Sequence, residues 1–261
     1  MNAPHPFHFE GGRLFGCLHL PATPQPVRVA VLMVQPLFGE YVQYHRAYFL
    51  LAEHLRKRGV PAMRYDHFGT GDSASDLHEA LFEHWVTDVG LCVRELRKRS
   101  GASRVLLVGA RLGAAVTVAA AADLAHMVGA VLWDPVWVPA QHLDELVEVR
   151  RRTLGRYLKQ PDSGLPGPDG SWDILGFHCS GALAESIRSA QPRIEHVSHE
   201  LEILAIGGSV AGWRPPRTHY RVAIEEVPYP RGWLDPQDGI YDVLVPVEVL
   251  NRVECWILDR A

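Results

Sequence analysis

The segment from Arg104 to Ala119 constrains the fold more than any other part of this chain of 261 residues. Val105 to Val108 are four consecutive apolar residues, which predict a buried strand. Gly109 and Gly113 predict a tight turn, and the alanine-rich run that follows predicts a closely packed helix. The residue at the centre of this strand-turn-helix corner is Arg111.

Strand and helix patterns alternate along the rest of the chain. Apolar runs predict strands over residues 27–34, 61–66, 128–133, 201–206 and 220–227, and helical spacing predicts helices over residues 44–58, 81–96 and 247–258. Gly11-Gly12 predicts the turn of an antiparallel hairpin between Phe7 and Leu20. The alternation indicates an α/β fold with a mostly parallel, doubly wound sheet. Charged helical patterns and turn-rich stretches over 139–191 indicate a helical cap, inserted between core segments 1–138 and 192–261.

Composition and charge exclude several classes of partner. The formal net charge is −4 and the pI is about 6.4, so no basic surface favours nucleic acid or anionic lipid. No apolar run approaches the roughly 20 residues of a membrane span. The first residues lack the charged and apolar segments of a signal peptide, so a cytoplasmic protein is expected.

These segments resemble the α/β-hydrolase superfamily. Asp66 to Ser73 is similar to the D-x-x-G-x-G-x-S segment that follows a core strand in that superfamily. Leu132 to Pro135 is similar to the end of the strand that follows the strand-turn-helix corner there. Phe38-Gly39-Glu40, Arg46 and Gly109 to Ala114 are similar to a triad-less branch with a G-x-R-L-G-A corner. That branch includes exosortase A system-associated hydrolase 2 and relatives from bacterial biosynthetic clusters.

The resemblance implies that the usual nucleophile is absent. The superfamily carries its serine at the centre of G-x-S-x-G, the position of Arg111 here, and a guanidinium cannot attack an acyl group. No histidine follows His219, and Asp134 is the one carboxylate left at a position that some members use for the acid. The resemblance also places the oxyanion or anion-binding amides at Leu37 or Phe38 and at Leu112.

A fixed positive charge at a helix N-terminus favours an anion. We therefore expect Arg111 to bind a carboxylate, acyl or peptide group of a small-molecule or peptide intermediate. Arg111, His67 and Asp134 are the expected catalytic residues of non-hydrolytic, substrate-assisted chemistry, namely epimerisation, cyclisation or elimination. The expected pocket residues are His45, Trp133, Trp137 and Trp233. No cofactor or metal is expected, and a homodimer is one possible assembly.

Three other hypotheses stay open. In the first, Arg111 forms an internal ion pair with Asp134 or Asp66, which fills the pocket. In the second, the protein is a non-catalytic pseudo-hydrolase scaffold or binding protein that holds an acyl or peptide intermediate for a neighbouring enzyme. A true ester or peptide hydrolase is the third. His178-Cys179 and His196-x-x-His199 are weaker signals for a thiol nucleophile and a metal site, because adjacent residues seldom have catalytic geometry and no third ligand is evident.

Overall fold

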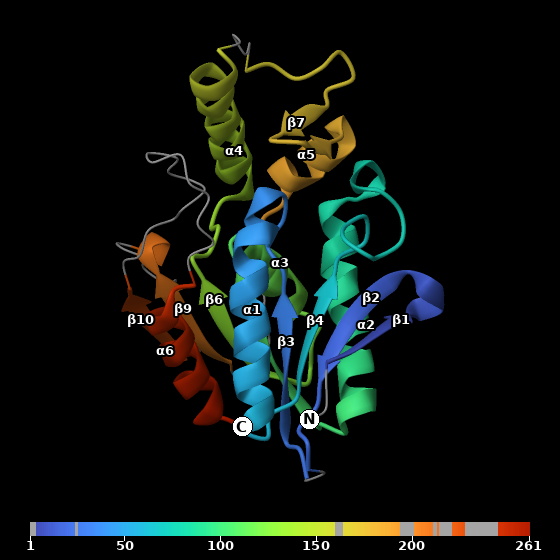
Figure 1. Ribbon diagram of the computed structural model, residues 1–261, viewed down its shortest axis with the longest axis vertical. Helices are drawn as coiled ribbons and strands as arrows, with labels where there is room; N and C mark the ends of the chain where they lie inside the picture. Colours follow the sequence, from blue (N-terminus) through green and yellow to red (C-terminus); the bar gives the residue numbers. More distant parts are fainter. Residues whose placement is uncertain are drawn as a thin grey trace.

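A central eight-stranded sheet organises the protein, as a computed structural model of residues 4–23, 26–159, 164–193, 201–210, 213, 221–227 and 245–261 describes it (Figure 1). Its strand order is β1-β2-β4-β3-β5-β6-β9-β10. The strands are β1 (His5–Phe9), β2 (Leu14–His19), β3 (Val29–Val34), β4 (Ala62–Asp66), β5 (Arg104–Ala110), β6 (Met127–Trp133), β9 (Glu202–Gly207) and β10 (Arg221–Glu226). β2 pairs antiparallel with β1 and β4, and the other pairs are parallel. The predicted α/β class, with a mostly parallel sheet and an antiparallel N-terminal hairpin, is confirmed.

Helices cover both faces of the sheet, and β3 shows why. Val29, Val31 and Met33 belong to the core beneath α1 (Gly39–Lys57) and α6 (Val247–Leu258). The alternate residues of β3 belong to the core beneath α2 (Phe82–Ser100) and α3 (Leu112–Ala121). Because successive side chains of a strand point to opposite faces, a strand covered on both sides is apolar throughout.

The apolar spacing predicts that this helix begins at Tyr44, but α1 begins at Gly39. Its buried face includes Glu40, Tyr44 and Tyr48, which lie one turn apart. A charged residue at the first buried position interrupts the apolar pattern, which explains why the sequence places the start one turn too late.

Residues 139–159 and 164–189 lie beyond the carboxyl ends of the parallel strands, at the top of Figure 1. They form α4 (Pro139–Thr153), the π-helical turn η3 (Leu154–Leu158), the two-stranded sheet β7 (Trp172–Ile174) with β8 (Phe177–Cys179), and α5 (Gly181–Ser189). The sequence does not predict β7 and β8, because three residues are too few for an alternating pattern. The Phe82 N–H donates to Ser186 Oγ at 3.0 Å, which joins α5 to the first residue of α2.

No helix within the described ranges is long and apolar enough to cross a membrane. Within the same ranges, no group of three or more His, Cys, Asp and Glu side chains is placed to hold a metal ion. His196 and His199 lie outside the described residues.

Two glycines allow α3 to pack directly against the strands. A Cβ atom at Gly113 would overlap the carbonyl oxygens of Val34 and Gln35, at the end of β3. A Cβ atom at Gly109 would overlap the Thr117 hydroxyl and the Gly113 backbone. The corner between β5 and α3 therefore depends on the absence of side chains at these two positions.

We expect Gly113→Ala to lower the free energy of unfolding by about 1–3 kcal/mol, because the new methyl group meets rigid backbone atoms. For a chain of this size the melting temperature should fall by about 2–4 °C per kcal/mol. Gly90→Ala on α2 is the matched control, since no heavy atom lies within 4 Å of its Cβ position. The control should stabilise the helix slightly. Equal melting temperatures for the two variants would contradict the packing argument.

Candidate functional site

Arg111 occupies the turn between β5 and α3 in a conformation that few side chains adopt. Its φ is 52° and its ψ is −124°. The Arg111 N–H donates to the Trp133 carbonyl oxygen at 3.0 Å, and its own carbonyl oxygen accepts from the Val136 N–H at 3.2 Å. These bonds to β6 and the loop after it hold the strained turn in place.

The Arg111 side chain points into the protein and is only 3% exposed. Its Nε donates to Glu40 Oε1 at 2.6 Å, and its Nη1 donates to the backbone carbonyl oxygen of Asp134 at 3.1 Å. Arg111 thus has an internal ion pair, as one hypothesis expects, but its 2.6 Å partner is Glu40, while Asp134 contacts it through the backbone and acts on it through its charge. Glu40 of α1 takes the place that the sequence analysis assigned to the carboxylate of Asp134 or Asp66.

His142 of α4 completes a buried charged group. Its Nε2 lies 3.1 Å from Glu40 Oε2, the carboxylate oxygen that Arg111 does not contact. Its Nδ1 lies 3.7 Å from Glu145 Oε2, one turn along α4. We refer to Arg111, Glu40 and His142 as the elbow cluster.

The two cations and the carboxylate of the elbow cluster stabilise one another's charges. Burial raises the pKa of Glu40, but Arg111 and His142 outweigh it and hold this pKa below its ordinary value. Burial lowers the pKa of His142, but the Glu40 carboxylate and the contact with Glu145 outweigh it and raise this pKa overall. With His142 protonated, Arg111 and His142 share the negative charge of Glu40, and the charge of the buried Asp134 also acts on Arg111.

Asp134 is buried beside the cluster, and its charge acts with that of Glu40 to raise the pKa of Arg111. Its Oδ1 accepts from the Ser209 N–H at 2.8 Å, and the Tyr44 hydroxyl lies 3.5 Å from its Oδ2. The backbone φ of Asp134 is 42°. Asp134 therefore contacts Arg111 through its backbone carbonyl oxygen, and its side chain accepts a hydrogen bond from the segment after β9.

The three residues expected to supply anion-binding amides lie at two helix N-termini. Leu37 and Phe38 directly precede α1, and Leu112 is the first residue of α3. Amides at the start of a helix have no acceptor within that helix. α1 also carries Glu40, and α3 follows Arg111 directly, so both helix N-termini adjoin the elbow cluster.

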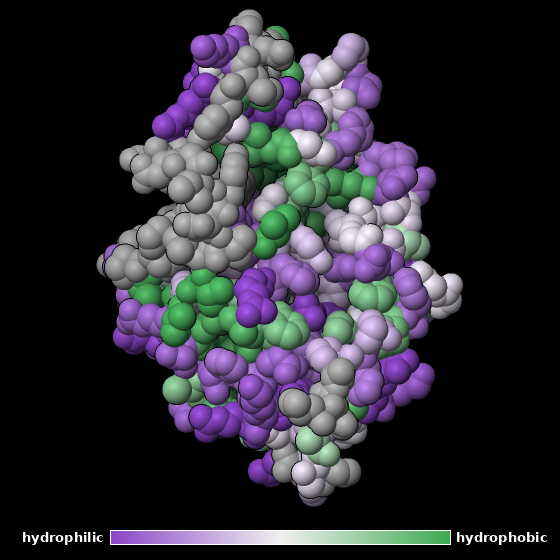
Figure 2. Space-filling view, in the orientation of Figure 1, coloured by the Kyte–Doolittle hydropathy of each residue, from purple (hydrophilic) through white to green (hydrophobic). Residues whose placement is uncertain are grey.

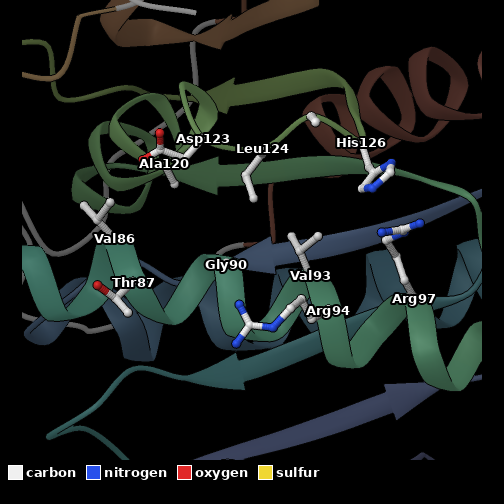
Figure 3. A pocket seen from close by; sticks show the side chains of 11 residues that line it. Val86, Thr87, Gly90, Val93, Arg94, Arg97, Ala120, Asp123, Leu124 and His126 are labelled. Atoms are coloured by element: carbon white, nitrogen blue, oxygen red, sulfur yellow. The ribbon is translucent and has the colours of Figure 1, made fainter.

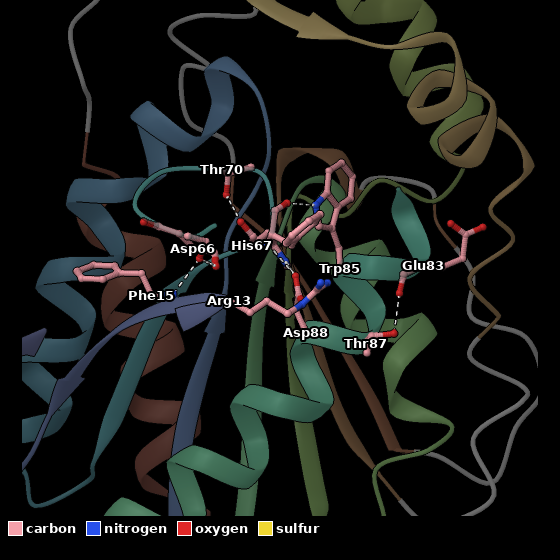
Figure 4. Close-up of polar contacts among 11 residues, drawn as sticks. Arg13, Phe15, Asp66, His67, Thr70, Glu83, Trp85, Thr87 and Asp88 are labelled. Carbon is pink, nitrogen blue, oxygen red and sulfur yellow. Dashed lines mark hydrogen bonds and ion pairs between the residues drawn. The ribbon is translucent and has the colours of Figure 1, made fainter. Parts of the chain in front are cut away.

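His67 does not join this site. Its imidazole is buried between β4 and α2, with ring centroids 4.8 Å from Tyr65 and 5.9 Å from Trp85 (Figure 4). Its Nδ1 lies 3.8 Å from Asp88 Oδ2, and neither ring nitrogen has a hydrogen-bond partner among the described residues. The expected role of His67 beside Arg111 is thus not supported, because its neighbours belong to the opposite side of β4.

The predicted pocket residues separate in the structure. Trp133 is fully buried in the core beneath α1, 5.0 Å from the Tyr44 ring. Trp137 is partly buried and stacks on Trp213, with ring centroids 3.9 Å apart. His45 lines a different cavity, between α1 and β4. Trp233 lies outside the described residues.

The candidate thiol of Cys179 is also unsuited to attack. Cys179 is buried at the end of β8, and burial raises the pKa of its thiol to about 12. A thiol with such a pKa is protonated at neutral pH, whereas the thiolate is the nucleophile.

A surface groove of about 500 Å³ runs along α2 and the end of α3 (Figure 3). Arg94, Arg97 and His126 point toward it. Arg99, in the last turn of α2, donates from its Nε to Glu95 Oε1 at 2.6 Å. The groove shares no residue with the elbow cluster.

Glu40 and His142 are the functional candidates that sequence analysis misses. Glu40 stands in the Phe38-Gly39-Glu40 motif and one turn before Tyr44 on the buried face of α1, which is the available signal. His142 lies 102 residues from Glu40 in a charged helix, and no local pattern marks it.

The elbow cluster predicts a pH-dependent contribution to stability. Because folding raises the pKa of His142 above its ordinary value of 6.5, its contribution is full below that value. It should disappear as the pH rises through the folded-state pKa. We expect the difference in unfolding free energy between the native protein and His142→Gln, measured with urea from about pH 6 to pH 9, to shrink as pH rises. A constant or growing difference would contradict this, while other histidines cancel in the comparison.

Comparisons with known proteins agree with this architecture. The model of the family described as "Serine aminopeptidase, S33" matches residues 31–167. No curated protein matches the chain. The chain is similar in structure to Est1E from Butyrivibrio proteoclasticus, at 16% identity and a TM-score of 0.64, with 99% of this chain and 98% of that chain covered.

Two further solved structures are similar over nearly their whole length. A carboxyl esterase from Bacillus coagulans has 16% identity and a TM-score of 0.64, with 98% of each chain covered. A monoglyceride lipase from Saccharomyces cerevisiae has 14% identity and a TM-score of 0.61, with 98% of this chain and 95% of that chain covered. These identities support the fold alone, whereas the family match spans more than half of the sequence. The chain therefore belongs to the serine aminopeptidase S33 family of α/β hydrolases.

Proposed function

We propose that this protein is a non-hydrolysing family member that binds a small molecule or peptide through a carboxylate or acyl group. The observation that carries the proposal is the buried Arg111 guanidinium, paired with Glu40 at 2.6 Å in the turn where hydrolases present their serine. A protonated guanidinium cannot form an acyl-enzyme. The G-x-R-L-G-A corner also supports assignment to the triad-less branch.

The charge of the site favours a negatively charged ligand group. Arg111 and protonated His142 share the Glu40 carboxylate, and the amides at the N-termini of α1 and α3 add partial positive charge. A carboxylate at this point would be attracted by both. Arg111 attracts the ligand carboxylate electrostatically while it stays paired with Glu40. The ion pair therefore does not have to break when the ligand binds.

The residues around the elbow cluster favour a ligand whose carboxylate is attached to an apolar group. Hydrophobic residues gather between α4, α5 and the upper end of α1 in Figure 2. We assign residues 139–191 the role of a cap over the bound ligand. Est1E, which has a similar structure, has been solved with ferulic acid bound, and ferulic acid is an aromatic carboxylic acid. Ferulate is therefore a suitable probe for this chain.

Non-hydrolytic catalysis is a second candidate, and the position of His142 favours it. His142 lies beside Glu40 and comes from the proposed cap, so a bound substrate would lie close to a histidine with a carboxylate partner. In this version His142 replaces His67 as the group that moves a proton in epimerisation, cyclisation or elimination. Arg111 would then stabilise negative charge as it develops on the substrate.

A fluorophosphonate probe tests the loss of the nucleophile. We expect no adduct on the intact protein by mass spectrometry, because no serine stands at the turn between β5 and α3. A serine esterase treated in parallel is the positive control and should gain one adduct. An adduct on this protein that maps to a single serine would restore the hydrolase hypothesis.

Thermal stability with ferulate and methyl ferulate tests the anion site. Ferulate at about 100 times its Kd should add about 2.7 kcal/mol of stability, or roughly 5–10 °C in melting temperature. Methyl ferulate has the same ring without the negative charge and should have a much smaller effect. Arg111→Met should remove most of the difference, whereas Arg252→Met, at an exposed position of α6, should keep it. Equal shifts with acid and ester in the native protein would refute carboxylate recognition.

A further inference from the structure

A polar cavity of about 140 Å³ lies between α1 and the neighbouring strands β2 and β4. Its lining includes Gln35 after β3, Tyr41 and His45 of α1, and Arg64 and Asp66 of β4. The cavity is distinct from the elbow cluster, because α1 contacts that cluster through the face one residue earlier, at Glu40 and Tyr44. One position along a helix is a rotation of about 100°.

One end of the cavity is formed by a buried cation, Arg64. Arg64 is 9% exposed, and its guanidinium donates to His19 Nε2 and His45 Nε2, each at 3.2 Å. Burial lowers the pKa of both histidines, so they accept these bonds as neutral imidazoles. No carboxylate oxygen of the described residues lies within the 4.0 Å ion-pair distance of Arg64. A guanidinium has five N–H donors, so donors remain for a further acceptor.

The other end of the cavity accepts hydrogen bonds. Asp66 is 7% exposed, its Oδ1 accepts from the Tyr41 hydroxyl at 3.0 Å, and its Oδ2 accepts from the Asp72 N–H at 3.0 Å. Asp72 also lines the cavity and is exposed to solvent. Gln35 is 2% exposed, and its Oε1 has no hydrogen-bond partner among the described residues. A buried acceptor without a donor is costly, so this end needs a donor.

We propose that this cavity binds a small zwitterion of the α-amino-acid class, with its carboxylate on Arg64 and its ammonium group between Asp66 and Gln35. The volume supports this size, since an engineered cavity of about 150 Å³ in another protein holds benzene, with six carbon atoms. Glycine, alanine and serine have about that number of non-hydrogen atoms. This second site is independent of the ligand proposed for the elbow.

Ligands with one charge match the cavity less well. A carboxylate alone would satisfy Arg64 and leave the Gln35 Oε1 without a donor, beside the Asp66 charge. An amine alone would satisfy Asp66 and Gln35 and leave the Arg64 charge uncompensated. Only a ligand with both groups meets the two ends together, which gives the experiment its controls.

Isothermal titration calorimetry of the full chain with glycine, L-alanine and L-serine tests the proposal. We expect saturable binding of at least one of them to a single site, at least about tenfold tighter than propionate and ethylamine, which each carry one charged group. No heat of binding for any amino acid up to about 50 mM, a concentration that saturates sites of millimolar Kd, would overturn it. Equal affinity for propionate or ethylamine would also overturn it, in favour of a simple anion or cation site.

Asp72→Asn then locates the site with little risk to folding, because Asp72 is exposed. It should weaken binding of the amino acid at least about threefold, since it removes a negative charge near the ammonium group. Asp76→Asn is the matched control, an exposed aspartate of the same loop that does not line the cavity. Equal losses of affinity in the two variants would refute the location.

Discussion

The buried ion pair between Arg111 and Glu40 is the interaction on which the proposed site depends. Both side chains are buried, and an unpaired charge at a buried position costs several kcal/mol. Each charge therefore stabilises the other only while the geometry of the pair is kept. The pair joins the turn after β5 to the first turn of α1. His142 extends it to α4, so one charged cluster connects the sheet with the segment above it.

The corner can hold an arginine because its backbone shape is set by the residues beside it. Gly109 and Gly113 allow α3 to approach β3 and β5, and the main chain of Arg111 is hydrogen-bonded to Trp133 and Val136. None of these contacts requires a particular side chain at position 111. A change of chemistry at this position is therefore compatible with the family fold, and for the same reason family membership does not define the reaction.

The first two turns of α1 lie between two separate polar regions. Glu40 contacts Arg111 and Tyr44 contacts Asp134, while Tyr41 and His45 line the polar cavity with Arg64 and Asp66. Residues four apart share a helix face, and adjacent residues do not. A single helix can therefore contribute to two sites without sharing a side chain between them.

The sequence by itself determined the sheet covered on both faces, the tight corner and the cation at its centre. Val29–Val34 is apolar at every position, and the glycine spacing around Arg111 is local, so both are visible in a single segment. Only the tertiary structure decided the partner of Arg111 and the surroundings of His67 and Trp133. Glu40 is 71 residues from Arg111, and ion pairs at that separation depend on how helices pack. The sequence does not distinguish a polar or aromatic residue that lines a pocket at a strand end from one that enters the core. The face that such a residue occupies depends on its neighbours in space.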